Sequence, residues 1–110
     1  MTVQINTDSN IEGNEALVVK INGVVESALD RNIENIERIT RIEVHLSDED
    51  AGKSGQNDKR CMMEARLEGV QPTGVTHRAS PLDNAVDGAA GKLARLIEGT
   101  VGRKDHQAMR

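Results

Sequence analysis

The sequence contains no phenylalanine, tryptophan or tyrosine among its 110 residues. Because proteins that read single-stranded nucleic acids stack the bases on aromatic rings, this absence argues against that mode of recognition. Cysteine occurs once, at Cys61, so no disulfide can form within the chain. No apolar run reaches the length of a signal peptide core or a membrane span, so we expect a cytoplasmic protein without a membrane partner.

Length and charge set the next bounds. We expect one domain, because a chain of 110 residues buries about two-thirds of its unfolded surface and has no room for a second core. The net charge is −4, so a surface that binds nucleic acid would need its cations gathered on one face. We predict a single domain over residues 1–104 and a polar, frayed tail over residues 105–110.

Hydrophobic periodicity predicts two strands and a helix in the first half of the chain. Residues 3–7 alternate apolar and polar side chains, as a short half-buried strand does. Asn14 is a suitable N-cap for a helix over residues 15–31, where apolar residues recur at helical spacing. From residue 39 the period changes to two, which predicts the clearest strand of the sequence. Residues 47–58 are acidic, contain glycine and lack large apolar side chains, so we expect a mobile, solvated loop.

The second half resumes the alternation and ends in a helix. Residues 59–68 predict a strand that turns Cys61 toward the core, and a turn leads to a last strand over residues 75–79. Ser80 is a suitable N-cap and Pro81 suits the first helical position, so we expect a long helix to begin there. The order strand, helix, three strands, helix predicts an α+β fold in which one sheet carries both helices on one face.

The last helix is predicted to have two distinct sides. Its apolar residues recur at three- and four-residue spacing and predict a buried face of Leu82, Ala85, Val86, Ala89, Leu93, Leu96, Ile97, Thr100 and Val101. The opposite side is predicted to carry Gly88, Gly91, Lys92, Arg95, Gly99, Gly102 and Arg103. Each glycine weakens a helix by about 1 kcal/mol relative to alanine. We therefore expect tertiary packing to hold this helix, or another group to approach its backbone closely.

Metal binding and nucleophilic catalysis are not favoured by the residues present. Strand alternation places His45 on the row opposite Leu46 and Cys61 on an inward row, while His106 lies in the tail, so these metal ligands do not converge. Cys61 with His77 would make a nucleophile and base if their strands were neighbours. An apolar row raises the pKa of a thiol, however, so we expect Cys61 to be a small core residue.

Nucleotide and calcium loops are also absent. Residues 88–92 superficially resemble a phosphate loop, but the full spacing is missing and the glycines fall inside the predicted helix. The acids at residues 48–50 lack the ligand alternation and terminal glutamate of a calcium loop. The sequence therefore predicts no cofactor, no metal and no enzymatic activity.

Basic residues remain as candidates for a binding surface. They are Arg78 before the last helix, Lys92, Arg95, Arg103 and Lys104 on or after it, and Lys59, Arg60 and Arg66 on the third strand. Such side chains suffice to bind double-stranded or ribosomal RNA through phosphates and 2′-hydroxyl groups, without aromatic rings. The alternative is that they pair with acids on a mixed surface, the acids being Asp83, Asp87, Glu64, Glu68 and Glu98.

The last helix also carries a family resemblance. The segments Leu82-Asp83-Asn84-Ala85-Val86-Asp87 and Lys92-Leu93-Ala94-Arg95, together with the order of elements, resemble the ribosome hibernation-promoting factor family, which includes sigma-54 modulation proteins. That family commonly has Tyr-Ala-Ala-Ile-Asp followed by Lys-Leu-Ala-Arg in this helix. The chain keeps Ala85, Asp87, Lys92, Leu93, Ala94 and Arg95 in that register.

The resemblance implies a β-α-β-β-β-α domain similar to double-stranded RNA-binding domains, with two helices on one face of a four-stranded sheet. It also implies docking in the small-subunit channel where messenger and transfer RNA bind, which blocks translation in resting cells. Lys92 and Arg95 correspond to the family's basic strip. The chain departs from the family at Asn84, which replaces an aromatic residue, and in a first helix with few cations, mainly Lys20 and Arg31.

We therefore expect a non-enzymatic translation inhibitor that binds small-subunit ribosomal RNA through its second helix. The alternative is a regulatory domain of the same fold that has lost RNA binding and contacts a protein partner through the open face of its sheet. A small enzyme is the third possibility. DNA is not an expected partner.

Overall fold

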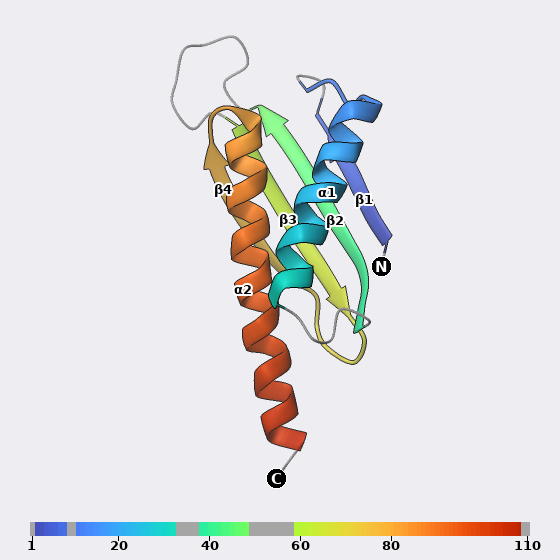
Figure 1. The fold of residues 1–110 in the computed structure, drawn as a ribbon, viewed down its shortest axis with the longest axis vertical. Coiled ribbons are helices and arrows are strands. Elements are labelled where there is room, and N and C mark those ends of the chain that lie inside the picture. The colour runs from blue at the N-terminus through green and yellow to red at the C-terminus, as the bar shows by residue number, and fades with distance from the viewer. Residues whose placement is uncertain (1, 9–10, 33–37, 49–58, 109–110) are drawn as a thin grey trace.

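Six elements make up the chain in the computed structural model, which describes all residues except 1, 9–10, 33–37, 49–58 and 109–110 (Figure 1). They are β1 (Thr2–Thr7), α1 (Glu15–Asn32), β2 (Ile39–Asp48), β3 (Lys59–Leu67), β4 (Thr73–Ala79) and α2 (Leu82–Ala108). This is the predicted order of elements. None of the helices in the described parts of the chain is long and apolar enough to cross a membrane.

The four strands form one sheet in the order β1-β2-β3-β4. β1 pairs with β2 in parallel, whereas β2 with β3 and β3 with β4 are antiparallel. A parallel pair needs a crossover connection, and α1 supplies it. Figure 1 shows both helices on the same face of the sheet, each beginning at the same end of it. The predicted α+β arrangement, with both helices on one face of a four-stranded sheet, is confirmed.

The core lies between this sheet face and the two helices. Its buried hydrophobic residues are Ile21, Val25, Leu29, Ile39, Ile42, Val44, Leu46, Cys61, Met63, Ala65, Leu67, Ala85, Val86, Ala89, Ala90, Leu93, Ala94 and Ile97. The strands contribute every second residue because successive side chains point to opposite faces. Ala90 and Ala94 were not part of the predicted stripe. They are buried because α2 packs against α1 as well as against the sheet.

The predicted N-cap of α1 is confirmed, whereas the contacts at the start of α2 differ from the predicted cap. The Asn14 side-chain oxygen accepts a hydrogen bond of 2.9 Å from the Leu17 N–H, as an N-cap does. At the start of α2, the Asn84 side-chain amide donates to the Ser80 carbonyl at 3.1 Å, and the Asn84 N–H donates to the Pro81 carbonyl at 3.0 Å. The helix thus begins at Leu82. At its other end α2 continues past Lys104 to Ala108.

The expected loop over residues 47–58 begins later than predicted. Ser47 and Asp48 still belong to β2, since the ladder with β3 continues to the pair of Asp48 with Lys59. The buried Asp48 carboxylate accepts a hydrogen bond of 2.9 Å from the Lys59 ammonium, and its backbone N–H donates to Asp8 at 3.0 Å. These contacts explain how an acidic residue, Asp48, can occupy the buried end of β2. Residues 49–58 lie outside the described part of the chain.

Candidate functional site

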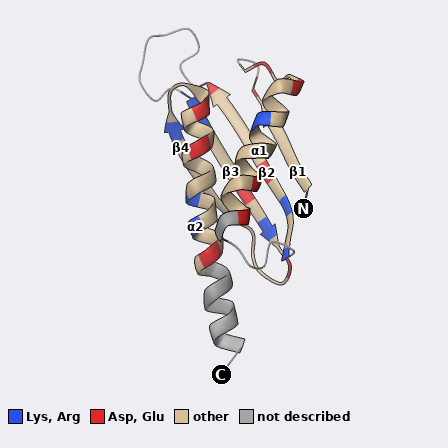
Figure 2. Cartoon of the chain, in the orientation of Figure 1, with Lys and Arg blue, Asp and Glu red and all other residues tan. Residues whose placement is uncertain are grey.

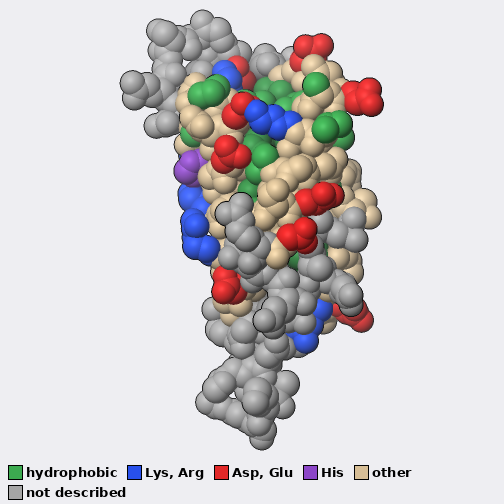
Figure 3. All heavy atoms as spheres, in the orientation of Figure 1, with side chains coloured by type: hydrophobic (Ala, Val, Ile, Leu, Met, Phe, Trp, Pro, Cys, Tyr) green, Lys and Arg blue, Asp and Glu red, His purple; other side chains and the backbone are tan. Residues whose placement is uncertain are grey.

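One group of the predicted cations lies along the edge formed by α2 and β4. Lys92 and Arg95 are both exposed on α2. The Lys92 ammonium donates a hydrogen bond of 3.1 Å to the backbone carbonyl of Thr76 on β4, the last strand of the sheet. His77 of β4 lies against α2 at Gly88. We call these residues (Thr76, His77, Gly88, Lys92 and Arg95) the α2–β4 edge, and Figure 3 shows basic side chains and a histidine following it.

A second group, Arg60 and Arg78, lies on the open face of the sheet. The two residues are direct partners in the β3–β4 register. Their neighbours Cys61 and His77 alternate to the helix side, so the arginine positions face away from the helices. Arg78 follows Thr76 by two residues, about 7 Å along the strand. This pair therefore adjoins the α2–β4 edge.

A third group is engaged in ion pairs within the protein. Lys59 lies on the helix side of the sheet and binds Asp48. Arg66, at the other end of β3, contacts Glu64 at 3.3 Å and Glu43 at 3.6 Å. Arg41 also pairs with Glu43, at 3.5 Å. The structure thus does not bring Lys59 or Arg66 together with the α2–β4 edge, and the expected mixed surface is found around Arg66.

The last two predicted residues, Arg103 and Lys104, lie in the final turns of α2. Their side chains fall outside the described part of the structure. α2 continues without a break from Lys92 to both residues. That Arg103 and Lys104 contact RNA therefore stays a prediction from the sequence.

The α2–β4 edge contains a contact that the sequence only hinted at. A Cβ atom added at Gly88 would lie 2.6 Å from Cγ of His77 and closer still to two other ring atoms. Only glycine permits this approach of the imidazole to the helix backbone. A glycine inside an otherwise regular helix was the signal for such an approach, but the partner could not be identified without the fold.

Charges on α2 are divided between its two flanks. Asp83 pairs with Lys20 of α1, and Asp87 lines the groove between the two helices. Lys92 instead reaches β4 on the opposite flank. Figure 2 shows acidic positions in the first turns of α2, basic positions after them and a further acidic position beyond these. A protein of net charge −4 therefore still presents a cationic edge.

Catalytic and metal chemistry find little support in the described residues. No group of three or more histidine, cysteine or acidic side chains could hold a metal ion in the described ranges. Cys61 is fully buried, and this burial raises the pKa of its thiol from 9.0 to about 12. Although Cys61 and His77 are register partners, as the nucleophile hypothesis required, the thiol is neutral at physiological pH.

The raised pKa of Cys61 predicts a loss of stability in alkali. In the unfolded chain the thiol ionises near its ordinary pKa of 9.0, whereas in the folded protein it stays neutral to about 12. The free energy of unfolding is therefore expected to fall above pH 9.0, by up to about 1.4 kcal/mol per pH unit. Urea denaturation of the wild type and Cys61→Ala on both sides of this pH checks it. Parallel pH profiles for the two proteins would contradict the expectation.

Known proteins resemble this chain both in sequence and in fold. The family model described as sigma 54 modulation protein / S30EA ribosomal protein matches residues 3–104. The N-terminal domain of protein Y from Thermus thermophilus has a similar structure, with a TM-score of 0.69 and 22% identity over 91% of this chain and 99% of that chain. A ribosomal subunit interface protein from Coxiella burnetii gives a TM-score of 0.68 and 16% identity over 93% of this chain and 99% of that one. No curated protein matches the chain.

Proposed function

Because the chain belongs to the sigma 54 modulation protein / S30EA ribosomal protein family, we propose that it binds the small ribosomal subunit and inhibits translation there. The protein acts as a non-enzymatic hibernation factor in the cytoplasm, and ribosomal RNA is its direct partner. The family membership supports the ribosome as the partner. The choice of RNA and of the contact residues rests on the charges of this chain.

The observation that carries the proposal is the division of charge on α2. Lys92 and Arg95 stand exposed on α2, and Lys92 reaches β4, while Asp83 and Asp87 of the same helix lie on the side toward α1. Phosphates approaching along β4 thus meet Lys92 and Arg95 without passing Asp83 or Asp87. Arg60 and Arg78 extend the positive surface around this strand onto the open face of the sheet.

The contacts on this surface fit a duplex backbone better than exposed bases. Guanidinium and ammonium groups bind phosphate oxygens through charge-assisted hydrogen bonds, and such contacts do not depend on base sequence. The composition offers no phenylalanine, tyrosine or tryptophan ring for stacking a base. Recognition therefore depends on the shape and charge of folded RNA, and a bound protein in the channel for messenger and transfer RNA excludes both.

We assign Lys92, Arg95, Arg60 and Arg78 as the phosphate contacts, and Arg103 and Lys104 as their continuation along α2. The Thr76 carbonyl holds the Lys92 ammonium at the edge of the sheet, where a phosphate can approach it from solvent. Lys59 and Arg66 stabilise the fold through their ion pairs with Asp48, Glu64 and Glu43. These two cations are not expected to contact RNA.

Co-sedimentation with purified small ribosomal subunits over a salt series tests the proposal. Each phosphate contact changes the slope of log K against log salt by about −0.7 to −0.9, so the six assigned cations predict a slope of about −4 to −5. Absence of binding at low salt, with the protein folded by circular dichroism, would contradict the proposal. That outcome would favour a regulatory domain of the same fold that binds a protein instead of RNA.

A further inference from the structure

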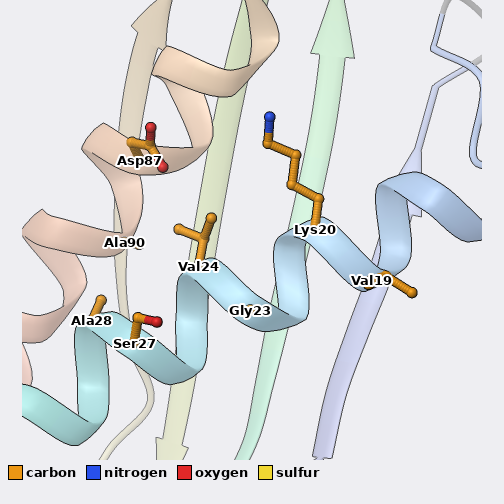
Figure 4. A pocket seen from close by; sticks show the side chains of 8 residues that line it. All are labelled: Val19, Lys20, Gly23, Val24, Ser27, Ala28, Asp87 and Ala90. Atoms are coloured by element: carbon orange, nitrogen blue, oxygen red, sulfur yellow. The ribbon is translucent and has the colours of Figure 1, made fainter.

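A groove of about 500 Å³ lies between α1 and α2, on the helix face of the molecule (Figure 4). Small and apolar residues line much of it. Gly23, Val24 and Ala28 come from α1, and Ala90 comes from α2. A Cβ atom added at Gly23 would meet nothing within 4 Å, so the groove is open to solvent at this point.

An exposed large hydrophobic residue stands at the edge of the groove. Val19, which is one of its lining residues, is 66% exposed. Exposed apolar side chains beside a concave surface are a common mark of an interaction site. Figure 3 shows hydrophobic side chains in the hollow between the two helices.

Acidic side chains surround this groove, whose lining also includes Lys20 and Ser27. Asp83 and Asp87 approach it from α2, and Asp87 is one of its lining residues. On α1, Glu26 and Asp30 are exposed and follow Val19 and Gly23 by seven residues, which places them on the same outward side of the helix. The cation in the groove, Lys20, is paired with Asp83. The rim therefore has a negative charge that repels phosphates and attracts cations.

We propose that the groove between α1 and α2 binds a basic, amphipathic peptide segment of a protein partner. The apolar side chains of the segment lie over Gly23 and Val24, and its lysines or arginines contact Asp87, Glu26 and Asp30. Such helix-in-groove binding uses apolar anchors for affinity and charge complementarity for orientation. The inference does not depend on the proposed function, because no residue of the α2–β4 edge takes part in it.

The groove and the α2–β4 edge lie on opposite flanks of α2, so a ligand on one does not cover the other. Lys92 reaches β4, whereas Asp87 faces α1. A peptide in the groove thus leaves the α2–β4 edge exposed, and RNA on that edge leaves the groove open. The protein is expected to bind both partners together.

The probe for this groove is a short synthetic peptide of lysine, leucine and alanine, arranged as an amphipathic helix and labelled with fluorescein. A peptide of the same composition in scrambled order controls for simple charge attraction. The Asp87→Lys variant reverses a charge in the groove, and Glu98→Lys makes the same change on an exposed residue of α2 outside it. Gly23→Leu fills the groove at the point where a side chain meets only open space.

Fluorescence anisotropy is expected to show that Asp87→Lys weakens peptide binding about tenfold, whereas Glu98→Lys changes it less than about twofold. Gly23→Leu is expected to abolish binding while its thermal unfolding stays cooperative. In ¹⁵N–¹H spectra the peptide should shift amides of residues 19–28 and 83–90.

Three outcomes would overturn the proposal. They are equal affinity of Asp87→Lys and Glu98→Lys, equal affinity for the scrambled peptide, and shifts confined to residues outside the groove. If an RNA duplex in place of the peptide shifts the groove amides, the groove binds nucleic acid and the proposal is wrong. None of these results bears on sedimentation with ribosomal subunits, so the two proposals fail independently.

Discussion

Neutralising both cations of the α2–β4 edge, as Lys92→Gln/Arg95→Gln, is expected to weaken binding to small ribosomal subunits about 100-fold at low salt. Each side chain supplies a charge-assisted contact worth about 1.4 kcal/mol or more, and the two losses add. The slope of log K against log salt is expected to become shallower by about 1.4–1.8, because two phosphate contacts and their released counterions are lost. Affinity measurements on filter-bound or sedimented complexes check both numbers.

A matched control removes the same charge from another part of the surface. Lys20→Gln/Arg66→Gln lowers the net charge by the same amount, but Lys20 pairs with Asp83 between the helices and Arg66 pairs with Glu43 and Glu64. Exposed ion pairs of this kind contribute about 0–1 kcal/mol, so the variant should stay folded. We expect its ribosome affinity to change less than about threefold at low salt. Equal losses in the two double variants would show that total charge, not the α2–β4 edge, determines binding.

Alanine at Gly88 is expected to destabilise the protein, whereas alanine at Gly23 is expected to stabilise it. Both glycines lie within helices, so each substitution gains about 0.5–1 kcal/mol of helix propensity. At Gly88 the new methyl group must displace the whole His77 ring, an overpacking cost of about 2–3 kcal/mol. The net result is a loss of about 1–2 kcal/mol at Gly88 and a gain of about 0.5–1 kcal/mol at Gly23.

A double-mutant cycle separates the His77 contact from other effects at Gly88. In a His77→Ala background the methyl group meets no ring, so Gly88→Ala should become neutral or stabilising there. Urea denaturation of the four proteins gives the coupling energy, for which we expect about 2 kcal/mol. A coupling energy near zero would mean that the imidazole moves aside without cost.

Most of the fold could be predicted because its elements carry local signals. The alternation through Ile42, Val44 and Leu46 separates a core face from an open face, and a shift by one residue would reverse it. The N-cap contact of Asn14 was predicted from its residue type and its place before the helical pattern. The start of α2 was less accurate, because Asn84 rather than the side chain of Ser80 makes the observed contacts at that end.

The contacts of individual cations could not be predicted in the same way. Lys59 and Arg60 are adjacent in sequence, but a strand sends them to opposite faces, and only the β2–β3 register brings Asp48 to Lys59. Arg66 meets Glu43 through the same register. These partners belong to another strand, so neither composition nor spacing along one segment contains them.

The division of charge on α2 is the property that the sequence represented least well. Helical periodicity separated a buried from an exposed side, and it placed Lys92 and Arg95 on the latter. It did not indicate that the acids Asp83 and Asp87 turn toward α1 while the cations turn toward β4. That distinction requires the positions of both neighbours of the helix.

Electron cryomicroscopy of the protein bound to the small ribosomal subunit would show which surface of the domain contacts RNA. We expect density for the domain in the channel for messenger and transfer RNA, with Lys92, Arg95 and the Arg60–Arg78 pair against RNA phosphates. The groove between α1 and α2 should then face away from RNA. A complex in which the acidic groove between the helices meets the RNA, or in which the α2–β4 edge is turned to solvent, would show that the α2–β4 edge is not the RNA-binding surface.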